Sequence, residues 1–183
     1  MEDTTFLDNF ESLLQDGLIK VCQGNGLVGD ELLDSPDVTG KWEDYIKDYV
    51  ADAVENFNDW PQTAIAWAGF LGLGVARNWD RSWEKHSHDS YKDYYGEHGF
   101  DDMHEHILHD ILGLDLESPE ARKISDTLSS CALATLGLIR HEGIEPQTSR
   151  GFYILIRAYT VLYRIGAGIE LKRLGYKKVA VRV

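Results

Sequence analysis

The chain has 183 residues, 43% of them apolar, which is typical of a globular domain and too apolar for a disordered acidic tail. It carries 31 acidic and 18 basic residues, so its formal net charge is −13. This charge argues against broad binding to nucleic acid or to anionic membranes, because phosphate contacts need clustered cations. No single motif fixes a biochemical activity.

The beginning of the chain lacks the basic and apolar pattern of a secretory signal. The longest uncharged run, residues 60–76, is shorter than the span of about 20 residues that crosses a membrane, and it contains three glycines. Cys22 and Cys131 lie far apart in the sequence without a Cys-x-x-Cys spacing, which predicts two reduced thiols. We therefore predict a cytoplasmic protein without a membrane segment.

Apolar residues recur at helical spacing, which predicts an all-α bundle of about six helices in one domain spanning residues 1–183. The first helix is expected to start at Thr4 and to end where a glycine-rich loop begins, at 23–38. We expect Thr39 to cap the second helix. The third helix, 61–83, is apolar on all sides over much of its length and is therefore predicted to be the central helix.

Small residues at Ala68, Gly72 and Ala76 predict a groove on this third helix where another helix backbone approaches closely. The segment 84–99 is polar and aromatic and predicts a loop with one helical turn near Ser90. Three further helices are predicted at 100–112, from Ser118–Pro119 to about 143, and at 151–174. The residues after these, 176–183, are predicted to form a short extended basic tail.

Two short stretches resemble uncharacterised bacterial all-helical families. They are Asn58-Asp59-Trp60-Pro61, which leads into an apolar helix containing glycine, and Gly99-Phe100-Asp101-Asp102-Met103. The resemblance implies an all-helical fold and no particular activity.

Histidines are concentrated in one part of the chain, with six of the seven between His86 and His109. On a predicted helix, Asp102, His106 and His109 share one face, because spacings of four and three residues place side chains one turn apart. Two imidazoles and a carboxylate are suitable ligands for a divalent transition metal such as Zn, Ni or Fe(II). The alternative is a solvated polar face, and no other cofactor is predicted.

Aromatic and basic residues at the end of the third helix suggest a small-molecule pocket. Trp79 and Trp83 lie one turn apart, and Arg77 beside them suits an organic anion. His104 falls on the apolar face of the predicted fourth helix and is a candidate to face the same ligand. The alternative is that these aromatic side chains fill the end of the bundle.

The net charge is unevenly distributed, with balances of −12 over residues 1–60, −8 over 61–120 and +7 over 121–183. An acidic front and a basic end attract one another, within one chain or between the two chains of a homodimer. The sequence therefore favours a non-enzymatic interaction or scaffold module that binds a protein partner or itself. Two alternatives stay open: a metal-dependent bundle, and an acidic binder of a basic protein, of the antitoxin or immunity kind. The second alternative would use acids of the second helix, namely Glu43, Asp44, Asp48, Asp52 and Glu55.

Overall fold

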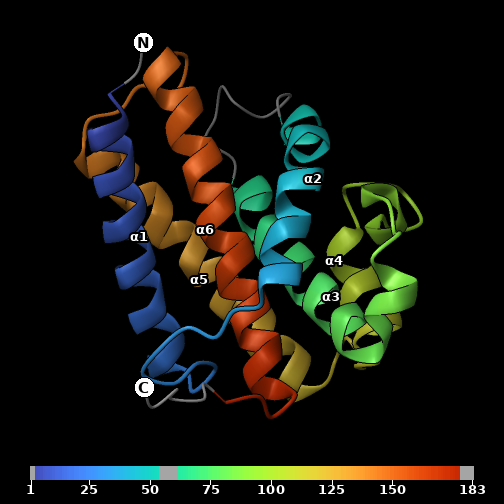
Figure 1. The fold of residues 1–183 in the computed structure, drawn as a ribbon. Coiled ribbons are helices and arrows are strands. Elements are labelled where there is room, and N and C mark those ends of the chain that lie inside the picture. The colour runs from blue at the N-terminus through green and yellow to red at the C-terminus, as the bar shows by residue number, and fades with distance from the viewer. Residues whose placement is uncertain (1–2, 54–61, 178–183) are drawn as a thin grey trace, which may run out of the picture.

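Helices account for most of the chain, as the sequence predicts. The structure is a computed structural model that describes residues 3–53 and 62–177, and these form an all-α bundle without a strand (Figure 1). Besides six α-helices it contains a 3₁₀ helix, η2, and a π-helix, η3. In chain order the elements are α1 (Thr4–Gly24), α2 (Pro36–Ala53), α3 (Gln62–His86), η2 (Tyr91–Tyr94), α4 (Met103–Glu105), η3 (His106–Ile111), α5 (Pro119–His141) and α6 (Ser149–Arg173).

Helix starts follow the polar residues that can accept hydrogen bonds from a free helix end. Asp3, Ser118 and Thr148 cap α1, α5 and α6 through their side-chain oxygens. The predicted start of the second helix at Thr39 is wrong, because α2 begins at Pro36. The amide of Thr39 already donates to the carbonyl of Ser35 at 2.9 Å, and a proline in the first turn loses no helical hydrogen bond.

The predicted fourth helix, 100–112, is shorter and less regular than expected. Only Met103–Glu105 is α-helical, and the chain then widens into the π-helix η3, where the amide of Leu112 donates to the carbonyl of Ile107 at 2.8 Å. The wider turn buries Ile107, Leu108 and Ile111 together. Helical turns of this kind are often found at functional sites.

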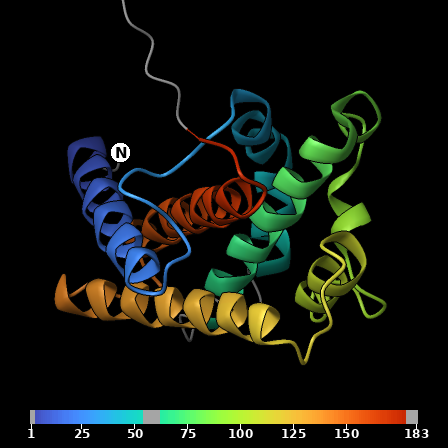
Figure 2. The ribbon, with the colours of Figure 1, turned by 90° about the horizontal axis from the view of Figure 1, so that it is seen from below.

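The centre of the bundle is a pair of helices, α3 and α6. Both are almost completely buried over their middle turns, so α6 shares the central position that the sequence assigned to α3 alone. Seen from below, α6 lies between α1, α5, α3 and α2 (Figure 2). Helix α3 also continues beyond the predicted end, to His86, across a kink at Ser82.

Glycines allow these two helices to cross at very short distance. A methyl group on Gly166 would lie only 2.7 Å from the carbonyl carbon of Gly69, and one on Gly72 would lie 2.8 Å from the amide nitrogen of Ala167. Real side-chain carbons essentially never come this close to a backbone. The predicted close approach at Gly72 is therefore confirmed, and Gly69 and Gly166 extend it.

Helix α6 is also the one described helix that is long and apolar enough to cross a membrane. In its most apolar window 67% of the residues are buried inside the bundle, where they contact α3, α1 and α2. This burial is typical of the core helix of a globular protein.

Candidate interaction surface

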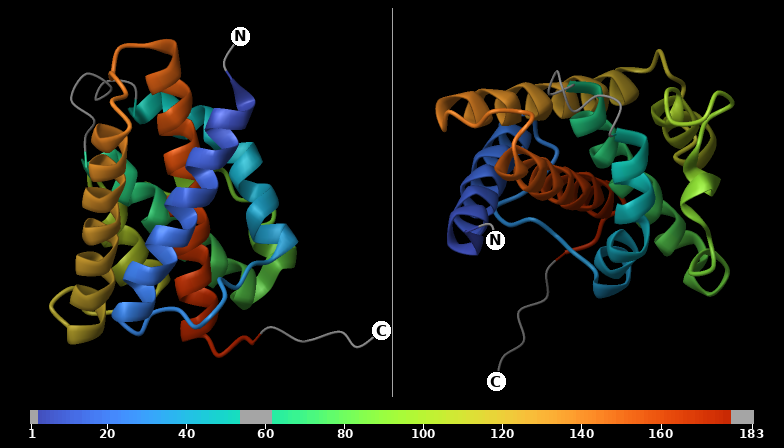
Figure 3. Two further views of the ribbon diagram at one scale, coloured as in Figure 1. Left: turned by 90° about the vertical axis from the view of Figure 1, so that its left-hand side faces the viewer. Right: turned by 90° about the horizontal axis from the view of Figure 1, so that it is seen from above.

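The cations of α6 are largely neutralised by acids of the same chain. Arg157 donates to Asp8 at 2.6 Å and lies 3.8 Å from Glu11, and Arg164 lies 3.6 Å from the same Glu11 carboxylate. These ion pairs join α6 to α1, which stand side by side in Figures 1 and 3. Part of the attraction between the acidic front and the basic end of the chain thus acts within one molecule.

A second ionic contact lies at the far end of α6. Arg173 donates to Glu170 at 2.7 Å and to Glu120 of α5 at 3.0 Å. The Glu170 side chain is completely buried, and burial raises its pKa, although Arg173 acts in the opposite direction. Arg77 is one further cation whose charge acts on Glu170, so this end of the bundle holds its own counterions.

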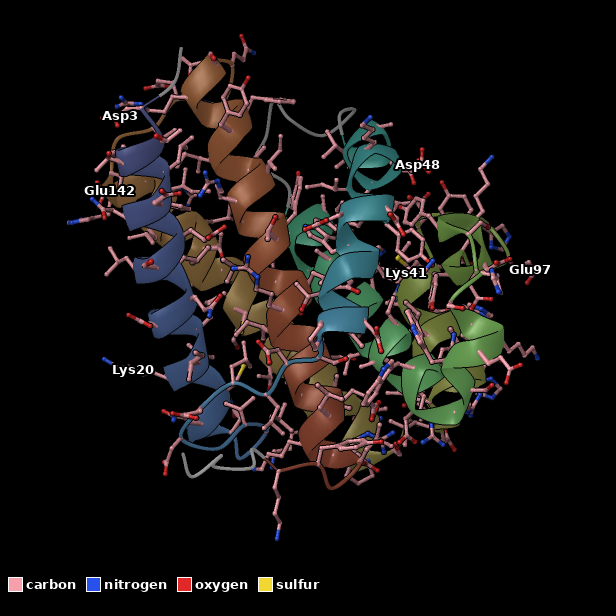
Figure 4. All side chains as sticks on the ribbon, in the orientation of Figure 1. Asp3, Lys20, Lys41, Asp48, Glu97 and Glu142 are labelled. Carbon is pink, nitrogen blue, oxygen red and sulfur yellow. The ribbon has the colours of Figure 1, made fainter. Side chains whose placement is uncertain are left out.

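The other side of the molecule carries most of the net charge. Helix α2 and residues 84–117, here called the acidic half, contain 15 acidic and 4 basic residues, a balance of −11 out of the −13 of the whole chain. They lie on the side of the bundle away from α1 (Figures 1 and 3). Many of these acids are exposed, and Asp48 and Glu97 have no salt bridge within the described residues (Figure 4).

A carboxylate and two tyrosines connect the two parts of the acidic half. Oδ2 of Asp52, at the end of α2, accepts hydrogen bonds from Tyr91 at 2.7 Å and Tyr95 at 2.6 Å. Tyr45 donates to the carbonyl of Asp89 at 2.8 Å. Burial raises the pKa of Tyr91 and Tyr95, and the Asp52 carboxylate raises both further, so these hydroxyls stay protonated and remain donors.

This network was not predicted from the sequence. Asp52 was recognised only as one acid of the second helix, and the tyrosines of residues 84–99 only as loop residues. The capping box of η2, in which Asp93 accepts from the amide of Ser90 at 2.8 Å, gave one local signal. The pairing across some forty residues has no local signal, because it depends on how α2 packs against the loop.

The three candidate metal ligands line one shallow cavity of about 200 Å³ beside η3. Asp102, however, accepts a hydrogen bond from the His98 ring at 2.9 Å. The rings of His106 and His109 are each hydrogen-bonded to the carboxylate of Asp110, at 2.8 and 2.7 Å. Within residues 3–53 and 62–177, no group of three or more His, Cys, Asp or Glu side chains is arranged to hold a metal ion. The observed geometry therefore favours three histidine–aspartate contacts over one coordination site.

These contacts shift the pKa of a histidine and the pKa of an aspartate in opposite directions. The hydrogen bond and charge of Asp102 raise the pKa of His98, whereas the hydrogen bonds from His109 and His106 lower the pKa of Asp110. The first contact therefore favours a charged Asp102 carboxylate next to a protonated His98 ring, and the second favours a charged Asp110. Six of the seven histidines lie in the acidic half, so its net charge depends on pH more than that of the other half.

The four residues of the predicted small-molecule pocket do not share one cavity. Trp79 lines a cavity of about 220 Å³ with Leu32 and Tyr176, and its ring nitrogen donates to Asp37 at 3.1 Å. Trp83 instead lies under the ammonium group of Lys41, which is 6.0 Å from the ring centre. Arg77 lies 3.6 Å from Asp80, and its charge acts on Glu170.

His104 lies elsewhere, against the first turns of α3. Its ring stacks on Trp67 with 4.1 Å between the ring centres and meets Phe70 edge-on at 5.7 Å. Trp67 and Trp79 are twelve residues apart on α3, or about 18 Å along a helix, so His104 and Trp79 cannot contact one small ligand. Burial lowers the pKa of His104, and its buried Nδ1 has no hydrogen-bond partner within the described chain.

No family model, no curated protein and no solved structure matches this chain. The resemblance to uncharacterised bacterial helical families stays a prediction. Of the stretches that carry it, residues 58–61 lie outside the described part of the chain, as do 178–183 of the predicted tail. Residues 99–103 form the turn that leads into α4.

Proposed function

We propose that this protein is a non-enzymatic binding module and that its working surface is the acidic half, which binds a basic protein. The proposal combines the interaction module predicted from the sequence with the alternative of an acidic binder of the antitoxin or immunity kind. It rests on one observation, the concentration of a balance of −11 in α2 and residues 84–117, while the remaining residues have a balance of only −2.

The distribution of ion pairs argues for a partner that is a separate molecule. In the α1–α6 half, Arg157, Arg164 and Arg173 are already engaged with acids of their own chain. In the acidic half the exposed carboxylates outnumber the local cations, which favours a partner that brings lysines and arginines. A homodimer held by the basic end of a second copy is less favoured, because those arginines are occupied.

The acidic half also has the composition of a recognition surface. Tyr91 is buried and shares the Asp52 acceptor with Tyr95, which is half-buried, and an aromatic side chain whose hydroxyl is held in this way gives contact area at low entropic cost. Long-range attraction to a basic partner would speed association, and the exposed part of Tyr95 would add short-range contacts.

The experiment compares two variants with the same net charge. The acidic-half variant combines Asp44→Asn, Asp48→Asn and Glu97→Gln, all exposed residues. The matched control combines Asp16→Asn, Asp126→Asn and Glu142→Gln, which are exposed on α1 and α5 and just after α5. The immobilised full chain is incubated with lysate of the source cells at low ionic strength, and proteins eluted by salt are identified and purified for calorimetric titration.

We expect a basic protein whose affinity falls about tenfold with the acidic-half variant and no more than about twofold with the control. Its affinity for the wild-type chain should also fall as salt rises, because salt screens exposed charges. An acidic or neutral partner, or equal losses with the two variants, would contradict the proposal.

A further inference from the structure

Two cysteines that are 109 residues apart in the sequence meet in the core of the bundle. Cys22 of α1 and Cys131 of α5 are both completely buried, and their Sγ atoms are 3.8 Å apart. Both are free thiols. From this geometry we propose that the pair forms a reversible intramolecular disulfide when the protein is exposed to a peroxide, and that this bond fastens α1 to α5.

The two thiols need only a small movement to react. A disulfide has an S–S length of about 2.05 Å, so the sulfur atoms must approach by about 1.8 Å, which side-chain rotation and a slight shift of α1 can supply. Helix α1 lies at the outside of the bundle and packs mainly on α5 and α6, so a slight shift of its last turn displaces few other elements (Figures 2 and 3).

The position of Cys22 also explains how an oxidant reaches a buried thiol. It lies in the last turn of α1, two residues before the helix ends at Gly24, and the ends of helices open locally more often than their centres. Cys131 lies in the middle of α5 and stays in place. The hydrogen bond from Cys131 lowers the pKa of Cys22, which marks Cys22 as the more reactive of the two.

The chemistry requires one molecule of hydrogen peroxide for each bond. The Cys22 thiolate attacks one peroxide oxygen, the O–O bond breaks, and the products are a Cys22 sulfenic acid and, after protonation, water. The Cys131 sulfur then attacks the sulfenic sulfur, its proton leaves with the hydroxyl group as a second water, and the S–S bond forms. Two thiols are thus oxidised by two electrons while peroxide is reduced to two waters, and a dithiol reductant reverses the result.

The test uses the full chain, treated with hydrogen peroxide and then quenched. We expect both free thiols to disappear, the intact mass to fall by two hydrogen atoms, and a peptide linking Cys22 to Cys131 to appear after digestion. The midpoint of thermal unfolding should rise by at least about 5 °C, because the bond closes a long loop in the unfolded chain, and dithiothreitol should restore it.

Two variants, Cys22→Ala and Cys131→Ala, should show no rise in the unfolding midpoint on oxidation. A third, with both changes and Ser12→Cys on the exposed side of α1, confirms that the peroxide oxidises an accessible thiol. The proposal is overturned if wild-type protein keeps both thiols under conditions that oxidise this third variant. It is equally overturned if Cys22 proceeds to a sulfinic acid, or if the only disulfides formed join two chains.

Discussion

The close crossing of α3 and α6 predicts that a single methyl group at Gly166 is more harmful than most larger changes at the surface. In Gly166→Ala the new methyl would lie 2.7 Å from the carbonyl carbon and 3.0 Å from the Cα of Gly69. These neighbours are backbone atoms of a buried helix, so the methyl can be accommodated only if the two helices move apart. The atom nearest to the new methyl is the carbonyl oxygen of Gly69, and carbon–oxygen contacts across helices are normally about 3.3–3.6 Å, so the helices must move apart by more than about 1 Å.

Such a shift affects the whole interface, because α3 and α6 share the core along several turns. Overpacking a tight core costs about 1–3 kcal/mol, and here the lost contacts on both sides of the crossing are added to that cost. We therefore expect Gly166→Ala to lower the free energy of unfolding by about 3 kcal/mol or more. For a chain of this size that corresponds to a fall of about 6–12 °C in the unfolding midpoint.

Gly137→Ala is the matched control, since Gly137 lies within α5 and a methyl there would meet nothing within 4 Å. Replacing a glycine inside a helix by alanine stabilises the helix by about 0.5–1 kcal/mol. Urea and thermal unfolding followed by far-UV circular dichroism measure both variants. If Gly166→Ala unfolds within about 0.5 kcal/mol of the wild type, the helices do not cross at this distance and the reasoning fails.

Three further predictions concern the acidic half and its surroundings. His104→Phe should stabilise the protein by about 1 kcal/mol at pH 8 by removing the unpartnered Nδ1, and more at pH 5, because burial lowers the pKa of His104. At a pH below about 6.5 the His104 imidazole takes up a proton more readily in the unfolded chain than in the folded one, so the free energy of unfolding of the wild type falls on acidification. Equal pH profiles of the two proteins in urea titrations would refute this. In the same assay Asp52→Ala should lower the free energy of unfolding by about 2 kcal/mol, because it leaves two tyrosine hydroxyls unpaired. Tyr95→Phe should lower it by about 1 kcal/mol, because it removes one hydrogen bond. Equal losses would argue against a shared acceptor. Raising sodium chloride to about 0.5 M should increase the midpoint of thermal unfolding, because salt screens the repulsion in the acidic half. Salt also weakens exposed ion pairs such as Arg157–Asp8, but each of these contributes under about 1 kcal/mol. A fall in the midpoint would show that the ion pairs dominate.

The fold could be predicted from the sequence because helix formation leaves local signals. Apolar spacing, caps such as Ser118 and the proline at 119 placed α5 and α6 to within a few residues. The errors arose where two local preferences compete. Pro36 suggested a loop as readily as a helix start, and the apolar pattern of 100–112 was consistent with an α-helix although the chain adopts a π-helix there.

The candidate sites were harder to predict because spacing does not decide which group a side chain binds, and because some of the partners are distant in the sequence. The helical spacing of Asp102, His106 and His109 was a correct basis for placing them near one another, and they do line one cavity. The same spacing of four residues relates His98 to Asp102 and His106 to Asp110, but spacing alone does not decide whether such groups bind one another or a metal ion. Likewise nothing in the sequence indicates that α1 carries Cys22 to Cys131, because helix packing alone decides this contact.

The distribution of charge over the folded molecule indicates a binding surface more clearly than the distribution along the sequence does. Three arginines of the last third, Arg157, Arg164 and Arg173, are paired with acids of α1, α5 and α6 itself, so these cations offer little to a second molecule. The acidic half keeps its repulsion, and uncompensated repulsion destabilises a folded chain. A partner that supplies cations would relieve this repulsion as well as form contacts, and it would bind only the folded protein. Binding at the acidic half should therefore raise the unfolding midpoint with partner concentration.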